Sequence, residues 1–265
     1  MVVVSVLMPN YNGDKYLKEA VNSILNQTFA DFELLIVDDC STDESLEVLR
    51  SFDDSRIKVF ENSRNLGIVK TRNRLFSLMS SSSEFVAIMD SDDIALPTRL
   101  ERQVAFLEKF KNIGIVGSNL IIIDENSKKI GTRSYSKNFS RSESFIKSPL
   151  AQPSVMISKK FLGDLRYSSE FEVAEDWDLW FRILKRCRGA NIQEPLLKYR
   201  ISTTQSKSLK LRRSIVNSLK VRFKYMGFKE YINVKILFRI VAECILLVLP
   251  SSFVMWLFKK MEIKK

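Results

Sequence analysis

Three aspartates, Asp90, Asp92 and Asp93, fall within four positions directly behind the apolar run "FVAIM". Such a run is typical of a buried strand, so the aspartates are expected at the point where the strand ends. Carboxylates this close repel one another and need a compensating cation. A hard divalent ion, held by one or two of them and completed by phosphate oxygens and water, meets that need. The alternative is that Asp92 or Asp93 only caps the helix opened by Pro97, but capping needs a single aspartate.

The chain contains no histidine, and this excludes whole classes of mechanism. Zinc–histidine sites, Ser-His-Asp triads and imidazole general bases are all impossible. Proton transfer therefore falls to other groups, with carboxylates as the leading candidates. Any metal is expected to have oxygen ligands, which favours Mg²⁺ or Mn²⁺. Cys40, Cys187 and Cys244 lie far apart and form no CxxC pair, so a reducing compartment fits better than a disulfide framework.

Two more polar clusters follow apolar runs near the N-terminus. Asp38 and Asp39 come after "LLIV", where a carboxylate could accept an N–H from a nucleobase. Helix capping by the residues at 41–43 is the competing interpretation, although it leaves the aspartate pair unexplained. In "PNYN", Tyr11 could stack on a planar base, but turn chemistry alone also accounts for this loop.

A fourth acidic stretch, "EDWDLWFRIL", begins at Glu175. Trp177, Phe181 and Leu184 recur at helical spacing, so these side chains are expected in the core. Glu175 and Asp176 would lie in the first turn, where the helix dipole favours acidic residues. A carboxylate beside apolar rings can also have its pKa raised toward that of a general base. The residues alone leave both interpretations open.

The first half of the chain supplies a scaffold for these clusters. Strands are expected at 2–8, 32–38, 57–60 and 84–90, and helices near 15–27, 43–51 and 67–80 and after Pro97. This alternation is typical of βαβ units and a parallel sheet. The carboxyl ends of parallel strands meet at one edge, so the polar clusters are expected to converge there. From about residue 113, two β-rich runs around "DENSKK" predict a hairpin.

Length and charge set the outer limits. A chain of 265 residues with 45% hydrophobic content predicts one main globular domain plus an appendage. The net charge of +11 is concentrated, because residues 204–265 hold 14 Lys and Arg against 3 Asp and Glu, which leaves 28 of each kind in residues 1–203. A neutral main body argues against a nucleic-acid partner. No secretory signal is expected in the strand-like start "MVVVSVLMP".

The basic tail also becomes increasingly apolar. "AECILLVLP" and "FVMWLF" are separated by Pro250, and neither run reaches the roughly 20 residues that a bilayer crossing needs. We therefore expect an interfacial or re-entrant anchor flanked by cations. The alternative is a helical subdomain that packs on the core.

Four motifs occur in order along the chain: "VSVLMPNYNGDKYLKEAVNSILNQTFADFELLIVDDCSTDES", "NLGIVKTRN", "MDSDDIALPTRLERQ" and "EDWDLWFRI". With them the chain resembles a family 2 glycosyltransferase of the GT-A fold, mostly bacterial cell-surface polysaccharide enzymes. The resemblance covers roughly residues 3–203, and four ordered motifs are far more specific than a lone Asp-x-Asp. It implies a Rossmann-like, mostly parallel central sheet with flanking helices. The expected division is a nucleotide-sugar half at 1–112, an acceptor half at 113–203 and the helical basic extension at 204–265.

The resemblance also implies an activity. It is an inverting transfer of a hexosyl or N-acetylhexosaminyl group from a nucleotide-diphosphate sugar, usually a UDP-sugar, to a hydroxyl of a glycan or lipid-linked acceptor. Acceptors in the family are frequently lipid-linked oligosaccharides at the cytoplasmic leaflet. The protein is therefore expected in the cytoplasm, held peripherally on the anionic inner face of the cell membrane by residues 204–265.

The resemblance further assigns residues to the donor. Pro9 and Tyr11 correspond to residues that line the nucleotide pocket. Asp39 corresponds to the acceptor of a hydrogen bond from the uracil ring. Arg72, in "TRN", is a candidate for contact with the nucleotide or the diphosphate.

The remaining assignments concern the metal and the base. "DSDD" matches the family's Asp-x-Asp region, which directs Asp90 and Asp92 toward the ribose and the metal. Either Asp92 or Asp93 ligates the metal, which is expected to be Mn²⁺ or Mg²⁺. Asp176, in the "ED" motif, corresponds to the catalytic base that deprotonates the acceptor hydroxyl.

Two departures from the family pattern stand out. Relatives often have histidine where this chain has Gln152, and again shortly after the "YR" motif, where this chain has Ser202. The expected consequence is a metal shell completed by water, weaker donor binding or reduced activity.

Two other functions compete with this interpretation. A nucleotidyltransferase would normally have a phosphate loop rich in glycine and lysine, whereas "PNYNGDK" has one glycine. A receiver-like, Mg²⁺-binding signalling domain would occupy about 120 residues and leave "EDWDLW" without a role.

Overall fold

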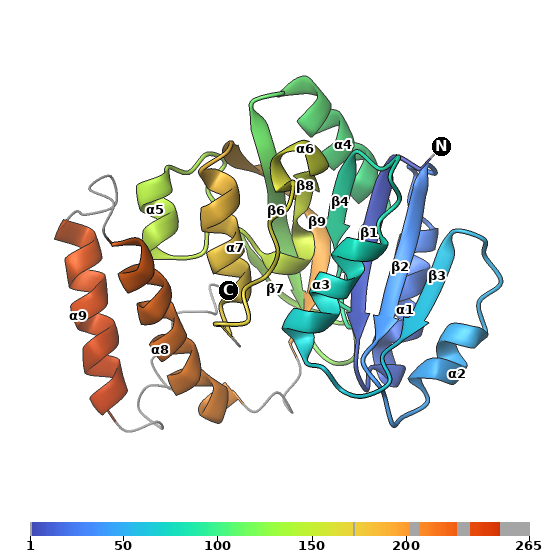
Figure 1. Cartoon of the computed structure of the whole chain (residues 1–265), viewed down its shortest axis with the longest axis horizontal. Coiled ribbons are helices and arrows are strands. Elements are labelled where there is room, and N and C mark those ends of the chain that lie inside the picture. Colours follow the sequence, from blue (N-terminus) through green and yellow to red (C-terminus); the bar gives the residue numbers. More distant parts are fainter. Residues whose placement is uncertain (1, 172, 202–206, 227–233, 250–265) are drawn as a thin grey trace.

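The computed structural model describes residues 2–171, 173–201, 207–226 and 234–249 (Figure 1). Two features singled out in the sequence, Ser202 and the apolar run at 253–258, lie outside the described residues. A single nine-stranded sheet has the strand order β3-β2-β1-β4-β8-β6-β9-β5, with β7 paired to β6. Helices cover both faces of this sheet.

The strands are β1 (Val4–Asn10), β2 (Phe32–Asp38), β3 (Ile57–Glu61), β4 (Phe85–Ile88), β5 (Ile94–Ala95), β6 (Ile113–Ile123), β7 (Lys129–Arg133), β8 (Met156–Ser158) and β9 (Arg188–Arg200). The helices are α1 (Asp14–Leu25), α2 (Ser45–Arg50), α3 (Ile68–Leu78), α4 (Arg99–Lys109), α5 (Arg141–Ile146), α6 (Lys159–Leu162), α7 (Glu175–Leu184), α8 (Lys207–Tyr225) and α9 (Val234–Val248), with a 3₁₀ turn at Gln152–Ser154. The strands and helices predicted between residues 2 and 90 agree with these bounds to within two residues.

The predicted parallel sheet is confirmed in the first half of the chain. Strands β3, β2, β1 and β4 are parallel neighbours, so their carboxyl ends lie along one edge. Every residue of β1 and β2 is buried, as expected for strands covered by helices on both faces.

The period-two alternation along β1 divides the core into two layers. Val6 and Met8 pack in one cluster with α1 and α4, through residues such as Leu17 and Leu100. Leu7 packs in the other cluster, with side chains of α3 and α7 that include Trp180. The sheet therefore holds α3 and α7 on the same face.

The second half adds the mixed part of the sheet. Strand β8 is antiparallel to β4, and β6 lies between β8 and the long strand β9, which is parallel to β6. Strands β6 and β7 form the hairpin predicted around "DENSKK". Strand β9 ends at Arg200, beside β5, and so returns the chain to the "DSDD" loop.

Helices α8 and α9 lie at the opposite end of the molecule from β3 (Figure 1). Their inner side chains join α5 and α7 in one apolar cluster, with Phe145, Phe181, Tyr225 and Ile236 among its buried members. The inner faces of α8 and α9 therefore pack against the rest of the protein, as the alternative of a helical subdomain on the core predicts. Within the described part of the chain, no helix is both long and apolar enough to span a bilayer.

Candidate active site

The loops after β1 and β2 are joined by hydrogen bonds, as the parallel sheet predicts. The Asn10 side-chain amide donates to Asp38 Oδ2 at 2.8 Å, and the backbone N–H of Asn12 donates to Ser41 Oγ at 2.9 Å. Asn12 and Cys40 both have positive φ, 50° and 62°, a conformation that non-glycine residues adopt at an energetic cost. The two loops therefore form one ordered unit at the sheet edge.

The loop after β4 closes against the same unit. A Cβ atom on Gly13 would collide with Asn10 Oδ1 and lie 3.3 Å from Ser91 Oγ. Glycine is therefore favoured beside the Asn10 side chain, and its missing side chain leaves the first loop close to the "DSDD" loop. The three polar clusters of the sequence are thus brought together.

Asp39 is buried and organises the "NLG" segment. Its Oδ1 accepts hydrogen bonds from Asn62 Nδ2 at 2.6 Å and from the Leu66 N–H at 2.8 Å, and its Oδ2 accepts one from the Gly67 N–H at 2.8 Å. Burial alone would raise the pKa of Asp39, but these hydrogen bonds lower it. Gly67 has φ 82°, which favours glycine at that position. Oδ2 retains a lone pair for a further donor.

Pro9 and Tyr11 differ in exposure. Pro9 is buried in β1 and lines a small cavity together with Arg72 and Tyr167. The Tyr11 side chain is 51% exposed, at the opening of the first loop. It is accessible to a ligand that enters the site from solution.

Arg72, on α3, joins two acidic clusters that are distant in sequence. One guanidinium nitrogen lies 3.0 Å from Asp90 Oδ1, and the other lies 2.5 Å from Glu175 Oε1. Its Nε is buried without a hydrogen-bond partner in the described structure. Burial opposes the charge of Arg72, but Asp90, Glu175 and Asp176 raise its pKa. The sequence assigned Arg72 to the donor alone, and its bond to Glu175 was missed.

Arg200 and the buried Arg99 offset only part of the negative charge of Asp92 and Asp93. Asp93 is 1% exposed; its Oδ1 accepts the Arg200 N–H at 2.8 Å, and its Oδ2 has no partner in the described structure. Burial, then the charges of Asp92 and Asp90, raise the pKa of Asp93. Burial and the charge of Asp90 raise the pKa of Asp92 to about 6. A cation in this place would relieve both effects.

The capping explanation for these aspartates is wrong. Helix α4 begins after Thr98, and no side chain caps it. Among the described residues no three His, Cys, Asp or Glu side chains converge as a complete metal site. An arrangement of one or two aspartates, with the other ligands from phosphate and water, fits the oxygen chemistry expected for Mg²⁺ or Mn²⁺. The unpartnered Asp93 Oδ2 is consistent with that fit.

Glu175 and Asp176 lie in the first turn of α7, after Ala174 at φ 71°. Burial and the neighbouring Asp176 raise the pKa of Glu175 to about 7, against the charge of Arg72. Burial also raises the pKa of Asp176, and Arg72 again opposes the change. Trp177, two residues after Glu175, is buried. The sequence prediction that the aromatic face of this helix belongs to the core is confirmed.

Asp176 borders a cavity of about 310 Å³, which we call the Asp176 cavity. The side chains around it include Lys147, Ser214, Ser218, Arg239 and Glu243. The cavity thus lies between the start of α7, the end of α5 and the two C-terminal helices. A molecule bound there would contact Asp176 directly.

Sequence reasoning missed two polar residues of the site, Arg200 and Tyr167. Arg200 donates from Nε to the Asp92 carbonyl at 2.8 Å and from its other side to Glu19 Oε2 at 2.6 Å. The "YR" motif, which contains Arg200, was the available signal in the sequence for this residue. Gln152 donates to Tyr167 Oη at 2.7 Å, and its Oε1 is buried without a partner in the described structure. Tyr167 gave no signal in the sequence.

Comparison with known proteins adds sequence relatives. The model of the family described as Glycosyl transferase family 2 matches residues 5–165. An uncharacterized glycosyltransferase of Methanocaldococcus jannaschii is 36% identical over 207 residues, 75% of this chain and 71% of that protein. The O-antigen biosynthesis glycosyltransferase WbnJ of Escherichia coli is 34% identical over 221 residues, 78% and 84% of the two chains. The UDP-Glc:alpha-D-GlcNAc-diphosphoundecaprenol beta-1,3-glucosyltransferase WfgD of Escherichia coli is 32% identical over 212 residues, 79% and 81%.

Solved structures share the fold. A mannosyltransferase from Pyrobaculum calidifontis, in complex with GDP-Man and Mn²⁺, has a TM-score of 0.64 at 16% identity and covers 95% of this chain and 71% of its own. S. aureus TarS 1-349, in complex with UDP-GlcNAc, has a TM-score of 0.61 at 20% identity and covers 91% and 79%. At these identities the likeness shows the architecture alone, and the predicted GT-A fold is confirmed.

Proposed function

The chain belongs to glycosyltransferase family 2, and on that premise we propose that it transfers a sugar from a UDP-sugar to an acceptor hydroxyl with inversion at the anomeric carbon. The transferred group is a hexosyl or N-acetylhexosaminyl group. A relative named for UDP-Glc and a structural neighbour in complex with UDP-GlcNAc support the uridine donor. Relatives named for O-antigen and diphosphoundecaprenol-linked substrates support a role in cell-surface polysaccharide biosynthesis.

The contact of Arg72 with both Asp90 and Glu175 carries this proposal. Asp90 belongs to the "DSDD" loop, on the donor side. Glu175 is the neighbour of Asp176, on the acceptor side. One arginine therefore spans the distance between the group that would hold the donor and the group that would activate the acceptor. A transferase needs this proximity because the nucleophile must reach the anomeric carbon.

The donor would be held by the first three loops. Asp39 would accept the imino N–H of uracil through the free lone pair on Oδ2, and Tyr11 would stack on the ring above Pro9. Arg72 and Asp90 would contact the diphosphate and the ribose. The low pKa of Asp39 supports its role as an acceptor, since a carboxylate has no proton to compete with the imino group.

Asp92 and Asp93 would hold a divalent cation, Mn²⁺ or Mg²⁺. We assign the direct bond to Asp92, because Asp93 is fully buried and already accepts the Arg200 N–H. When bound there, the ion would neutralise negative charge that grows on the leaving diphosphate. The Mn²⁺ in the mannosyltransferase complex supports a divalent ion in this fold.

Asp176 would be the general base. Of the two acids at the start of α7, Glu175 is bound to Arg72, whereas Asp176 faces the Asp176 cavity. The raised pKa of Asp176 suits a group that must take a proton from an alcohol. The acceptor would be a glycan or a lipid-linked saccharide, and the protein would work from the cytoplasm, peripherally on the anionic inner face of the membrane.

Binding and turnover of UDP-Glc and UDP-GlcNAc, each measured with and without Mn²⁺, test these roles. Asp92→Asn is expected to lose the metal-dependent part of nucleotide-sugar binding. Asp176→Asn is expected to keep that binding and to lose turnover, including slow donor hydrolysis, by about 10²- to 10⁴-fold. Asp164→Asn makes the same change at an exposed acid and should alter neither.

Two results would contradict the proposal. Nucleotide-sugar binding that is indifferent to metal and to Asp92→Asn would remove the metal site. Full turnover in Asp176→Asn would remove the assigned base, and loss of turnover in Glu175→Gln alone would transfer that role to Glu175.

A further inference from the structure

Helix α9 presents an apolar stripe to the outside of the molecule. Six large apolar side chains on this helix are between 52% and 82% exposed: Val234, Leu237, Phe238, Val241, Ile245 and Val248. They are six of the thirteen exposed large apolar side chains in the described part of the chain. At 100° per residue they fall within an arc of about 100°, which makes one continuous face. We call these six residues the α9 stripe.

The opposite side of α9 is fixed to the rest of the protein. Ile236 and Glu243 point inward and are buried. Glu243 binds the buried guanidinium of Arg222 and also accepts a hydrogen bond from Arg239 at 2.9 Å. Arg222 in turn donates to two backbone carbonyls at the end of α5, at 3.0 and 2.8 Å. Helix α9 is therefore a rigid part of the surface, and its stripe cannot turn inward without breaking this network.

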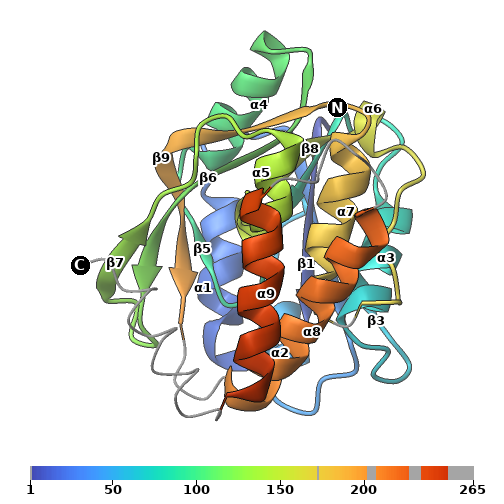
Figure 2. The same ribbon diagram turned by 90° about the vertical axis from the view of Figure 1, so that its left-hand side faces the viewer.

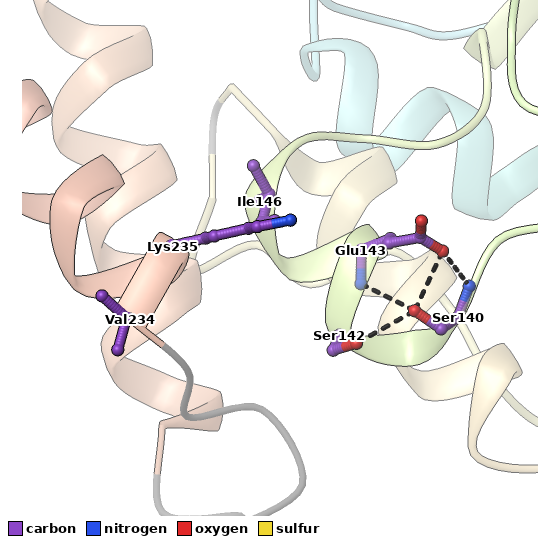
Figure 3. Close-up of a pocket in the computed structure, with 6 residues that line it drawn as sticks. All are labelled: Ser140, Ser142, Glu143, Ile146, Val234 and Lys235. Carbon is purple, nitrogen blue, oxygen red and sulfur yellow. Dashed lines mark hydrogen bonds between the residues drawn. The ribbon is translucent and has the colours of Figure 1, made fainter.

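A groove of about 610 Å³ separates the start of α9 from α5 (Figure 3). Lys235 extends alongside Ile146 in this groove, and Val234 also lines it. Ser140 and Glu143 of the α5 start form a capping box, and the hydrogen bonds from Ser140 and the charge of Lys235 lower the pKa of Glu143. Lys235 is thus a cation at the edge of the α9 stripe, with an acidic partner across the groove.

Charge identifies the occupant of the stripe. Residues 204–265, which include α8 and α9, hold 14 Lys and Arg against 3 Asp and Glu. An apolar helix face on a segment with this excess of cations in its sequence matches the interface of an anionic bilayer, where acyl chains meet negative headgroups. In Figure 2, α9 lies across the front of the molecule with no other described helix or strand over it.

The same helix also forms a wall of the Asp176 cavity. Arg239 and Glu243 line that cavity from α9, while Asp176 lines it from α7. The stripe and the cavity therefore lie on two sides of one helix. Whatever holds the stripe also determines the position of the cavity.

We propose that the α9 stripe inserts among the lipids of an anionic membrane and that this contact holds the Asp176 cavity at the bilayer surface. An acceptor anchored in the same bilayer then meets Asp176 without leaving the membrane. The last step rests on the proposed sugar transfer, whereas binding of α9 to lipid deepens only the proposed membrane location.

Vesicle flotation of the full-length protein tests the contact. Vesicles of phosphatidylglycerol with phosphatidylcholine are compared with vesicles of phosphatidylcholine alone. The triple variant Leu237→Ser, Phe238→Ser, Val241→Ser is expected to lose at least about tenfold in binding to the anionic vesicles, because apolar burial drives insertion. The control variant Val59→Ser, Ile68→Ser, Ile130→Ser also replaces three exposed apolar side chains and should bind as the wild type does. Equal flotation of all three proteins overturns the proposal.

Depth of insertion gives a second, independent readout. Tryptophan introduced by Phe238→Trp should be quenched by brominated acyl chains, and tryptophan introduced by Lys147→Trp, at the edge of the cavity, should be quenched less strongly. Val59→Trp, on β3 at the far end of the molecule, should not be quenched. If Lys147→Trp is as unquenched as Val59→Trp, the cavity does not lie at the membrane.

Two controls separate this inference from the proposed function. UDP binding should be unchanged in the stripe variant, so a wild type that binds UDP with Mn²⁺ but does not float contradicts the inference and the proposed membrane location, and leaves the proposed sugar transfer untouched. A wild type that floats but neither binds nor hydrolyses a UDP-sugar contradicts the proposed function alone. Light scattering that shows a dimer in the wild type and a monomer in the stripe variant, without flotation, would assign the stripe to a second copy and overturn the inference.

Discussion

Replacing Arg72 with methionine is expected to destabilise the protein in a way that depends on pH. Arg72 is in contact with both Asp90 and Glu175. Methionine keeps much of the side-chain volume and removes the charge. Glu175, which is buried, and Asp176, which is half-buried, are then left adjacent and without their nearest cation.

The size of the loss in unfolding free energy follows from the burial of the two ion pairs that Arg72 makes, with Glu175 and with Asp90. The side chains of Arg72 and Glu175 are 10% and 11% exposed, and removal of one partner from such a buried pair costs about 3–5 kcal/mol. Asp90 is more exposed, so its share should be below about 1 kcal/mol. Glu175 already has its pKa raised to about 7, from 4.5, and loss of Arg72 raises it further. A pKa that is higher in the folded state means that stability is kept at low pH and lost as pH rises.

Urea unfolding of wild type and Arg72→Met at about pH 5 and about pH 8 measures this effect. The deficit in unfolding free energy should be about 3–5 kcal/mol at the higher pH and should shrink at the lower pH, where Glu175 takes up a proton. Adding Glu175→Gln to Arg72→Met should recover about 2 kcal/mol at the higher pH. Lys70→Met removes an exposed cation from the same helix and serves as the control. A deficit that is independent of pH, or that Glu175→Gln does not reduce, would refute the reasoning.

Two further predictions concern the charge state of the site. The unfolding free energy of the metal-free wild type should fall by about 2–3 kcal/mol as pH rises from about 5 to about 8. The reason is that the pKa values of Glu175 and Asp92 are raised to about 7 and about 6 in the folded protein. Urea unfolding across this pH range measures the change, and an unfolding free energy that stays constant or rises would contradict the prediction. Asp39→Asn should lower the unfolding free energy by about 2 kcal/mol, because an amide cannot accept from all three donors now bound to the carboxylate. The same variant should weaken UDP binding, measured by titration, whereas Asp31→Asn at an exposed position should change neither quantity.

Local pattern explains what the sequence predicted well. The parallel strands were recognisable because each is short, apolar and followed by a polar cluster, as at Asp38 and Asp90. The buried face of α7 followed from the spacing of Trp177, Phe181 and Leu184, which depends only on helix geometry. Convergence of the clusters then followed from the rule that parallel strands end at the same edge.

Partners that are distant in sequence were beyond this kind of reasoning. Arg72 and Glu175 are 103 positions apart, and Asp93 and Arg200 are 107 apart. Their contacts depend on how α7 and β9 return to the sheet edge, which no local period specifies. Glu243 is a further example of a distant partner. In the sequence it is a charge within an apolar run, whereas in the structure it is the buried partner of Arg222.

These distant partners explain how so many acids coexist in one site. Asp90, Asp92 and Asp93 share the "DSDD" loop, and Glu175 and Asp176 approach them from α7. Arginines from three other elements offset part of this charge. Arg72 lies between the two groups, and Arg200 bonds the backbone and side chain of the "DSDD" loop. The charge of Arg99, on α4, opposes the rise in the pKa of Asp93.

The compensation is uneven, and the unevenness matches the proposed roles. Glu175 has its own arginine, and one oxygen of Asp93 is bound to the Arg200 N–H. Burial raises the pKa of Asp92 and of Asp176, and the buried Oδ2 of Asp93 has no partner in the described structure. Asp176 also borders the cavity where an acceptor hydroxyl is expected. A purely structural cluster would gain nothing from these incompletely compensated carboxylates, whereas a transferase needs one group to attract a metal ion and another to attract a proton.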